Sequence, residues 1–398
     1  MAVKASARYR DRRFPLTDSA AIDFSLVPLA DRDGLEGAWL ELERRARPSL
    51  FQSWSWIGSW LAAIPDDVGL YLLTGRIEGA VCALAVFSSA TRHRHGWLRS
   101  DGLFLNEAGR PDLDALTIEY NGILADEALA PDATLQALRF LVTDPPAGPG
   151  WDEIYLSGVD EALADKVAAA GLLPHLLADK PCDYVDLEAV RTSGKGYLEG
   201  RSKNSRYQIR RALRRYEDRG ALTLSVPSTL VEALEVFAEL KALHQSYWTG
   251  RGETGSFANP FFEEFHRLFI ERRFAAGEVE LLRASAGDET IGCLYNFRYG
   301  GRVYGYQSGF AYEEDPALKP GLVSHYLAIE RNLADGAAVY DFMAGFGQHK
   351  RSLGTDRRQM VWLSGQRPRV KYRLERALRC AKNLLKGATG AAGKQGTD

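Results

Sequence analysis

Residues 278–344 carry the pattern that most restricts what this chain can fold into. Three segments rich in β-branched and aromatic residues follow one another, and the short turns Gly287-Asp288 and Gly300-Gly301 separate them. Two-residue turns of this composition join neighbouring antiparallel strands. We therefore expect a three-stranded meander with strands at Glu278–Ala284, Thr290–Tyr299 and Arg302–Ala311.

The chain leaves this meander through a loop at Glu313–Gly321 and a helix at Leu322–Ala334, and it then enters a further strand at Val339–Ala344. The helix carries an apolar stripe with 4-3-4 spacing, so it is expected to pack on a sheet. A basic tip, Gly345–Lys350, follows the last strand directly.

Composition narrows the class of protein. The chain has 398 residues, which is room for two domains, and 45% of them are hydrophobic and 26% charged. The formal net charge of −2 argues against a polycation that binds nucleic acid through bulk charge, and DNA is not an expected partner. The four cysteines are widely spaced, which predicts a reducing compartment without a disulfide framework or a metal site. No signal peptide or membrane-spanning run is recognised, so we expect a cytoplasmic protein.

The order of predicted elements repeats along the chain. Residues 21–189 and residues 190–366 each run helices, a meander, a helix and a strand, which predicts two tandem α/β (α+β) units. Each unit would be a mixed, mostly antiparallel sheet flanked by helices. In the first unit we expect a strand at Thr117–Gly122. Residues 1–20 are expected to be disordered, and residues 367–398 are expected to form a basic helix and a flexible tail.

The loop before the helix at Leu322–Ala334 is a candidate anion site. Gly321 lets a ligand approach the backbone, Lys319 adds a positive charge, and the free N–H groups of Leu322, Val323 and Ser324 point out of the helix N-terminus. Helix N-termini favour phosphate by up to about 2 kcal/mol in partly buried geometry. The alternative is a plain proline-glycine turn.

The basic tip is a candidate catalytic element. Lys350 could stabilise an oxyanion formed when an amine attacks a thioester or ester carbonyl. His349 could carry a proton, and Asp341 could be either the base that deprotonates the amine or a structural residue. A solvated lysine and a surface histidine are the alternatives.

The strand Arg302–Ala311 offers further polar groups. Alternation with period two places Tyr304, Tyr306 and Ser308 on one face and Gln307 on the other. Tyr306 could protonate a leaving thiolate and Gln307 could orient the substrate, whereas aromatic packing within the sheet would explain the tyrosines equally well.

Two segments concentrate positive charge. The predicted helix at 201–219 carries eight basic and two acidic residues, and Arg206, Arg210 and Arg214 form a row with a spacing of four, which we call the arginine row. This row suits an anionic partner such as a nucleotide-linked sugar, a lipid diphosphate, tRNA or an anionic bilayer, or else it is a solvated face. Residues 367–386 carry eight basic residues and could lie on the inner face of a membrane or pack against the protein.

Taken in order, several of these segments resemble the CelD-like acetyltransferases of the GNAT superfamily, which are found with bacterial exopolysaccharide genes and are related to the FemAB peptidyltransferases. The resemblance spans residues 25–365 and is strongest after residue 200. It is carried by Phe51–Trp56, Ser205–Arg215, Leu243–Trp248, Tyr304–Phe310, Lys319–Gly321 and Asp341–Lys350.

The resemblance implies two GNAT-like units, with catalysis mainly in the second, and direct transfer of an acyl group within a ternary complex. By position, Lys319, Gly321 and Leu322 match the pyrophosphate loop. Tyr306 and Gln307 match the central strand, and Lys350 matches the basic residue after the last core strand. His244 and Trp248 are assigned to the substrate side. The donor would be acetyl-CoA or another acyl-CoA, without a metal.

One departure leaves the donor open. The usual signature, Arg or Gln followed by x-x-Gly-x-Gly or Ala, is reduced here to Gly321, so acyl-CoA, acyl carrier protein and aminoacyl-tRNA all stay possible. The leading hypothesis is an N-acyltransferase acting on an amino sugar or polysaccharide precursor that is free, nucleotide-linked or lipid-linked. The alternatives are FemAB-like transfer from aminoacyl-tRNA and a non-catalytic scaffold that binds a membrane or nucleic acid.

Overall fold

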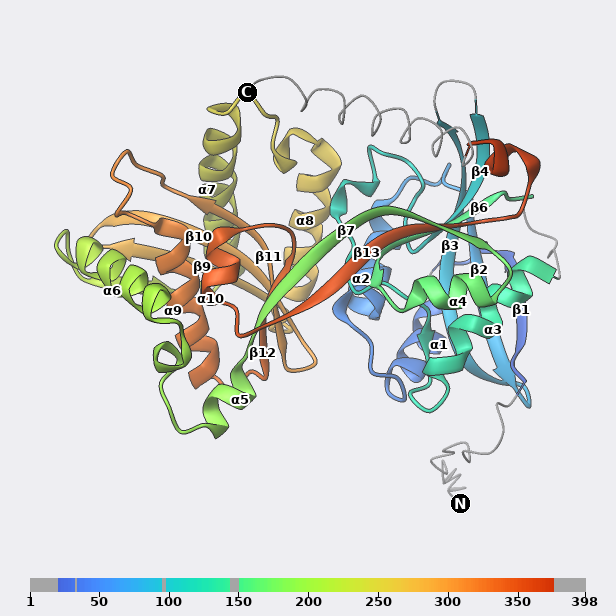
Figure 1. Ribbon diagram of the computed structural model, residues 1–398, viewed down its shortest axis with the longest axis horizontal. Helices are drawn as coiled ribbons and strands as arrows, with labels where there is room; N and C mark the ends of the chain where they lie inside the picture. Colours follow the sequence, from blue (N-terminus) through green and yellow to red (C-terminus); the bar gives the residue numbers. More distant parts are fainter. Residues whose placement is uncertain (1–20, 33, 95–97, 144–149, 376–398) are drawn as a thin grey trace, which may run out of the picture.

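The computed structural model describes residues 21–32, 34–94, 98–143 and 150–375. Within them one sheet runs through the whole molecule, and helices cover both of its faces (Figure 1). The strand order is β1-β2-β3-β4-β6-β13-β7-β12-β11-β10-β9-β8, with the short β5 paired to β3. Residues 1–20, which were expected to be disordered, lie outside the described residues. So do residues 376–398 of the expected basic helix and tail.

The two halves contain corresponding strands. Those of the first half are β1 (Asp23–Pro28), β2 (Leu70–Ile77), β3 (Ala80–Arg94), β4 (Leu98–Leu105), β5 (Leu124–Ala125), β6 (Glu153–Asp160) and β7 (Leu173–Asp186). Those of the second half are β8 (Leu222–Ser225), β9 (Val279–Ala286), β10 (Glu289–Tyr299), β11 (Arg302–Phe310), β12 (Val339–Ala344) and β13 (Asp356–Gln366).

The helices complete the repeat. The first half has α1 (Leu35–Glu43), α2 (Trp54–Ala63), α3 (Ala130–Thr143) and α4 (Leu163–Ala169). The second half has α5 (Leu187–Thr192), α6 (Lys203–Glu217), α7 (Leu230–Thr249), α8 (Pro260–Arg273), α9 (Pro320–Ala334) and α10 (Gln348–Leu353). In both halves a strand, two helices, three antiparallel strands, a helix, a parallel strand, a helix and a long strand follow one another. This arrangement confirms the predicted fold class of two tandem mixed units.

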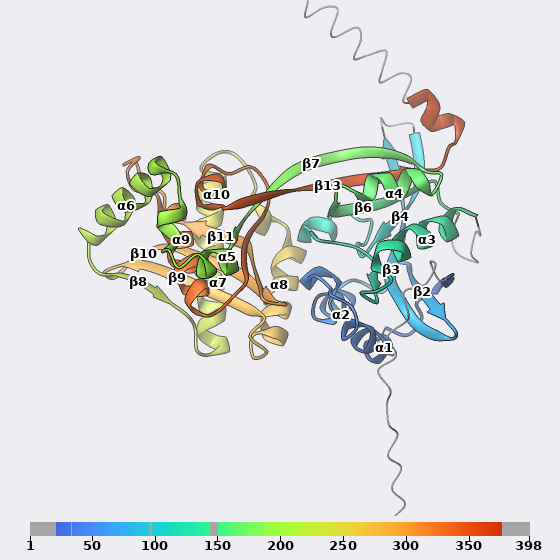
Figure 2. The same ribbon diagram turned by 60° about the horizontal axis from the view of Figure 1, so that its bottom comes forward.

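The long strands β7 and β13 tie the halves together. They pair with each other, while β7 also pairs with β12 of the second half and β13 with β6 of the first. Figure 2 shows the two strands crossing side by side from one half to the other. The predicted boundary at residues 189 and 190 therefore falls just after β7, a strand that pairs with strands of the second half.

An aromatic core joins the same two halves on one face of the sheet. Phe51 and Trp56 of the first half are buried, and the ring of Trp56 lies 4.9 Å from Phe265 on α8 and 5.8 Å from Phe297 on β10. Burying a side chain of this kind contributes about 1.5–3 kcal/mol. The segment that contains Phe51 and Trp56 thus helps to hold the two halves in place relative to each other.

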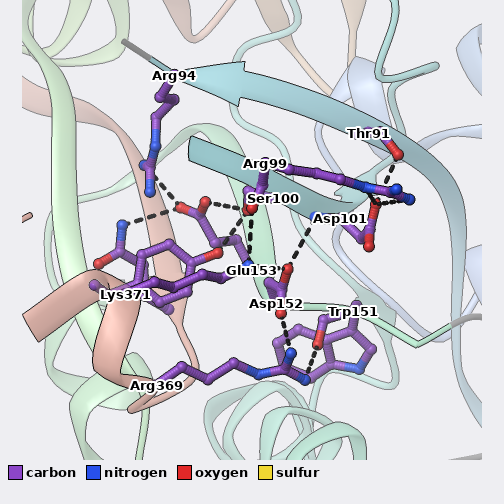
Figure 3. Close-up of polar contacts among 12 residues, drawn as sticks. Thr91, Arg94, Arg99, Ser100, Asp101, Trp151, Asp152, Glu153, Arg369 and Lys371 are labelled. Carbon is purple, nitrogen blue, oxygen red and sulfur yellow. Dashed lines mark hydrogen bonds and ion pairs between the residues drawn. The ribbon is translucent and has the colours of Figure 1, made fainter. Parts of the chain in front are cut away.

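Residues 367–375 dock on the first half through the buried Asp152 carboxylate and through Tyr372, whose hydroxyl lies 2.6 Å from the Ser100 hydroxyl beside Glu153 (Figure 3). The Glu153 carboxylate accepts hydrogen bonds from Ser100 (2.5 Å), Arg94 (3.0 Å), Ser364 (3.0 Å) and Gln366 (3.0 Å). Nearby, the Asp152 carboxylate forms ion pairs with Arg369 and Lys371, each at 2.5 Å. This part of the predicted basic segment packs against the protein, and membrane contact stays a prediction for the residues beyond 375.

Among the described residues, no helix combines the length and the apolar character that crossing a membrane requires. The same part of the chain contains no group of three or more His, Cys, Asp or Glu side chains placed to hold a metal ion.

Candidate active site

The second half contains a pocket where two parallel strands separate. β11 and β12 pair only from Arg302 with Val339 to Tyr304 with Asp341, and they diverge beyond these residues. A pocket of about 120 Å³ lies in the gap. Its wall consists of Thr117, Glu119, Ser256, Phe262, Gly305, Tyr306, Gln307, Phe342, Met343, Ala344 and Lys350.

Glu119 reaches this pocket from the first half of the chain. Its side chain is only 3% exposed, and its carboxylate accepts a 2.8 Å hydrogen bond from the backbone N–H of Ala344. Burial raises the pKa of Glu119 to about 7, and the nearby Asp341 raises it further, while the Ala344 N–H and the Lys350 ammonium act in the opposite direction. A carboxyl group with this pKa can exchange a proton near neutral pH.

The segment that carries Glu119 was expected to be a strand, and this prediction is wrong. Thr117 and Tyr120 have positive φ angles of 49° and 51°, which no strand tolerates. The segment instead fills the gap between β4 and β6, where Asn121 N–H donates to the Gly158 carbonyl at 3.1 Å. Gly158 has φ +61°, and a Cβ there would clash with the Ile118 carbonyl.

Lys350 lies beside this carboxyl group at the end of β12. Its ammonium donates to the carbonyl oxygens of Met343 (3.3 Å) and Ala344 (3.2 Å). Burial lowers the pKa of Lys350, and the Glu119 carboxyl partly compensates. Met343 holds a positive φ of 61°, an unfavourable conformation for a residue with a side chain that is seen most often at functional sites.

Asp341 supports the pocket from behind. It is completely buried, and its carboxylate accepts hydrogen bonds from Tyr120 (2.5 Å), Arg302 (2.8 Å) and the Met343 N–H (2.8 Å). These contacts hold β11, β12 and the Glu119 segment together. Of the two roles that the sequence left open for Asp341, this geometry favours the structural one.

His349 also lies behind the pocket wall. Its ring stacks on His325 of α9, with centroids 5.4 Å apart and an interplanar angle of 7°. Burial lowers the pKa of His349 to about 4, and the charge on Lys350 lowers it further. The imidazole is therefore neutral at pH 7 and has no proton to give as a cation.

Tyr306 and Gln307 both line the pocket because β11 contains a bulge. Tyr295 is paired with Gln307 and Asn296 with Gly305, so Tyr306 is an extra residue in the ladder. The predicted alternation, which separated Tyr306 from Gln307, is therefore wrong at this point. The Tyr306 hydroxyl donates to the Leu116 carbonyl, and burial holds its pKa well above the usual range. The Gln307 amide donates to the Ser256 hydroxyl at 3.3 Å.

The predicted phosphate loop lies at the start of α9, outside the pocket wall. Lys319 donates to the Gln208 side chain at 2.9 Å. Gly321 faces the Phe310 ring, where a Cβ would lie 3.1 Å away. The side chains of Leu322, Val323 and Ser324 are buried, so a ligand at this turn would meet backbone and Lys319 only.

The arginine row lies on the outer surface of α6, likewise away from the pocket. Arg210 and Arg214 are exposed, and the guanidinium of Arg206 donates to the carbonyls of Glu199 and Arg201. A hollow of about 630 Å³ runs along the helix here. Ile209, Ala212 and Tyr216 on the opposite face are buried.

His244 and Trp248 lie on α7 near the pocket entrance. His244 is buried between the Ser308 carbonyl (3.1 Å) and the Ser256 N–H (3.3 Å), which fixes Ser256 beside Gln307. Burial lowers the pKa of His244. The Trp248 ring is 6.0 Å from that of His244 and only partly buried.

Of the residues that line the pocket, only Tyr306, Gln307 and Lys350 were predicted from the sequence, and the polar residues Thr117, Glu119 and Ser256 were not. One indirect sign in the sequence is that Glu119 is the single charged residue of the segment Thr117–Gly122. Nothing local indicated that this segment approaches the second half.

Comparison with known proteins bears on the fold of the chain. Residues 203–351 match the family described as Acetyltransferase (GNAT) domain. FemX is a similar solved structure, with 12% identity and a TM-score of 0.52, and the match covers 83% of this chain and 95% of that one. No curated protein matches the sequence.

A second solved structure is the C-terminal domain (DUF2156) of a protein provisionally named lysylphosphatidylglycerol synthetase from Agrobacterium fabrum. It has 12% identity and a TM-score of 0.50, and the match covers 89% of this chain and 97% of that one. Likenesses at this identity concern the fold alone, and the CelD-like assignment stays a prediction. The match of residues 203–351 supports an N-acyltransferase with a GNAT-like second half, within a fold of two GNAT-like units.

Proposed function

We propose that the chain is an N-acyltransferase that moves an acyl group from acyl-CoA to the amino group of an amino sugar or polysaccharide precursor. The single observation that supports this most strongly is Glu119, a buried carboxyl with a pKa of about 7 in the gap between β11 and β12. An ammonium group cannot attack a carbonyl, so the site needs a group that accepts a proton near neutral pH.

Each polar group of the pocket has a role in this proposal. Acyl-CoA supplies a thioester carbonyl; the C–N bond forms as the C–S bond breaks. Glu119 accepts the proton that the attacking amine loses, and the Lys350 ammonium stabilises the negative charge on the carbonyl oxygen. The thiolate leaves and is protonated by solvent, because the Tyr306 hydroxyl is already engaged by Leu116. Gln307, held by Ser256, orients the acceptor.

The donor diphosphate would lie at the first turn of α9, as the sequence predicts. Lys319 and the backbone of Gly321–Ser324 are the groups available there, since the side chains of Leu322, Val323 and Ser324 face the core. His349 and Asp341 keep the wall of the pocket in place. The arginine row would contact the phosphate groups of a nucleotide-linked or lipid-linked acceptor, and the reaction would belong to exopolysaccharide or cell-envelope synthesis.

An acyl-transfer assay tests this function. The purified chain is incubated with acetyl-CoA or longer acyl-CoAs and with free or nucleotide-linked hexosamines, and released CoA thiol and acylated product are both measured. Glu119→Gln should lower kcat by about 10²–10⁴, the usual contribution of a general base. The control Glu188→Gln, an exposed acid on α5, should keep wild-type activity. Full activity in a folded Glu119→Gln variant would contradict the assigned base.

A second donor is favoured by the exposed charge of α6. Arg210 and Arg214 have no acidic partner within ion-pair distance among the described residues, which would suit aminoacyl-tRNA as the donor. Binding of tRNA through this surface would weaken steeply with salt, and Arg210→Gln with Arg214→Gln would reduce the slope by about two. Acyl-CoA turnover with a free hexosamine, which has no phosphate for the arginine row to contact, should be unchanged in this double variant, and this would separate the two donors.

A further inference from the structure

The first half contains a larger cavity than the candidate active site, at the equivalent place in the repeated fold. Its volume is about 400 Å³, within the range of small-molecule sites. It lies where β4 and β6 diverge after pairing at Gly102–Phe104, beneath α3 and α4. These elements correspond to β11, β12, α9 and α10 of the second half. There the stack of His325 on His349 closes the space between the two helices.

The interior of this cavity is apolar. Phe87 and Leu105 come from β3 and β4, Ile154 and Leu156 from β6, and Leu138 and Leu163 from the two helices. A lining of this kind favours an aliphatic chain, because apolar surface on both partners leaves water.

Four charged residues line the cavity, and two of them, Asp160 and Lys166, have no ion-pair partner among the described residues. Arg47 and Glu127 pair with each other at 2.8 Å, and the Asp160 carboxylate accepts a hydrogen bond from the Ala162 N–H at 2.9 Å. The Lys166 ammonium donates to the Pro131 carbonyl at 2.7 Å, and no carboxylate of the described residues lies within ion-pair distance of it. A cation beside an apolar interior fits a chain with an anionic head.

The inner end of the cavity cannot support acyl transfer. The segment that carries Glu119 occupies the gap between β4 and β6, where Asn106 donates to the Asn121 side chain at 2.9 Å and Asn121 donates to the Leu105 carbonyl at 2.9 Å. Glu119 itself points to the second half. The first half therefore keeps the hollow between its helices, but none of the described carboxyl groups in its lining lies between β4 and β6 as Glu119 lies between β11 and β12.

We propose that this cavity, which we call the α3/α4 cavity, binds an acyl chain with an anionic head group and does not react with it. A fatty-acid carboxylate and the phosphates of acyl-CoA share this chemistry. The acyl chain lies against Leu138 and Leu156, and the head group contacts Lys166. The α3/α4 cavity is separate from the Glu119 pocket, so its occupancy does not depend on the function proposed for that pocket.

Calorimetric titration with decanoate, kept below its micelle concentration, tests the proposal on the full chain. Thr134 is a half-buried residue of α3 that lines the cavity, and Thr134→Trp should fill it and weaken binding at least about tenfold. Ala168→Trp adds the same side chain to an exposed position of α4 outside the lining and should bind like wild type. Lys350→Ala should also leave decanoate binding unchanged, which distinguishes this site from the active-site pocket.

Two further titrations examine the head group and its source. Lys166→Gln should weaken decanoate binding about threefold to tenfold and leave decanol binding unchanged, because only the first ligand is charged. Only the binding that Thr134→Trp removes belongs to the α3/α4 cavity. If this part is tighter for decanoyl-CoA than for decanoate, acyl-CoA is the source, and the reverse order would identify free fatty acid. Absence of decanoate binding to wild type, or equal affinity in wild type and Thr134→Trp, would overturn the proposal.

Discussion

Glu119 is a carboxyl group that the fold keeps away from water, and this has a consequence for stability. Its pKa is raised from 4.5 to about 7 in the folded chain, chiefly by burial. Between these two pH values the unfolded chain has already lost the proton that the folded chain still holds. Stability due to this group is therefore lost as pH rises from about 4.5 to about 7.

Glu119→Gln should remove this loss. The variant should match wild type near pH 4 and should be more stable above pH 7, by up to about 3 kcal/mol at 1.36 kcal/mol per pKa unit. Glutamine can still accept the hydrogen bond from Ala344. Urea unfolding at several pH values measures the free energy of unfolding of both proteins. The contribution of His349 has the opposite sign, and it cancels in the difference because both proteins contain this residue. A difference that does not change with pH would contradict the raised pKa.

Single residues also show where sequence reasoning reached the site and where it did not. Lys350, Tyr306 and Gln307 were predicted and do line the pocket, since they lie on or soon after strands that are readable locally, although the bulge that brings both Tyr306 and Gln307 to the pocket was not predicted. Glu119 was not predicted, because it lies on a loop more than 180 positions before Tyr306, Gln307 and Lys350 in the sequence. The roles of Lys319–Ser324 and the arginine row stay predictions.

At the scale of elements, the Glu119 segment depends on one glycine of β6. Gly158 has φ +61°, and a Cβ would clash with the backbone of Ile118. Gly158→Ala should therefore destabilise the protein beyond the roughly 1 kcal/mol that positive φ costs, and it should lower kcat by moving Glu119.

Gly171→Ala is the matched control for that change. Gly171 has φ +84°, and the space around its Cβ position is open. Gly171→Ala should lose only the stability that positive φ costs a residue with a Cβ, and its kcat should not change. Urea unfolding and the transfer assay measure both effects, and equal losses in the two variants would show that the contact with Ile118 is unimportant.

Elements differed in how well they could be predicted. β12 (Val339–Ala344) has the predicted bounds, since an apolar run forms the buried strand, and α9 ends at the predicted residue, Ala334. β7 and β13 were missed. β7 contains two prolines and exposes Leu176 and Leu177, and β13 begins with three charged residues, so neither shows the alternation of an ordinary strand.

At the scale of the whole molecule, the halves are joined by exchanged strands. β6 pairs with β13 and β12 with β7, so each sheet is completed by the other half. Residues 1–189 and 190–398 expressed separately should each lack a cooperative unfolding transition, and mixing them should restore one. Circular dichroism melts of the pieces and of the mixture measure this. Two pieces that each melt cooperatively would show that the predicted domains are independent.

In the proposed reaction Glu119, a base from the first half, acts in the pocket of the second half. The most direct measurement is kcat/KM against pH for wild type and Glu119→Gln with one amine acceptor. The ratio of the two values cancels the titration of the amine itself. It should rise about tenfold per pH unit up to a pH of about 7 and stay constant above it. A ratio that is constant from pH 5 to pH 9 would show that Glu119 does not accept the proton.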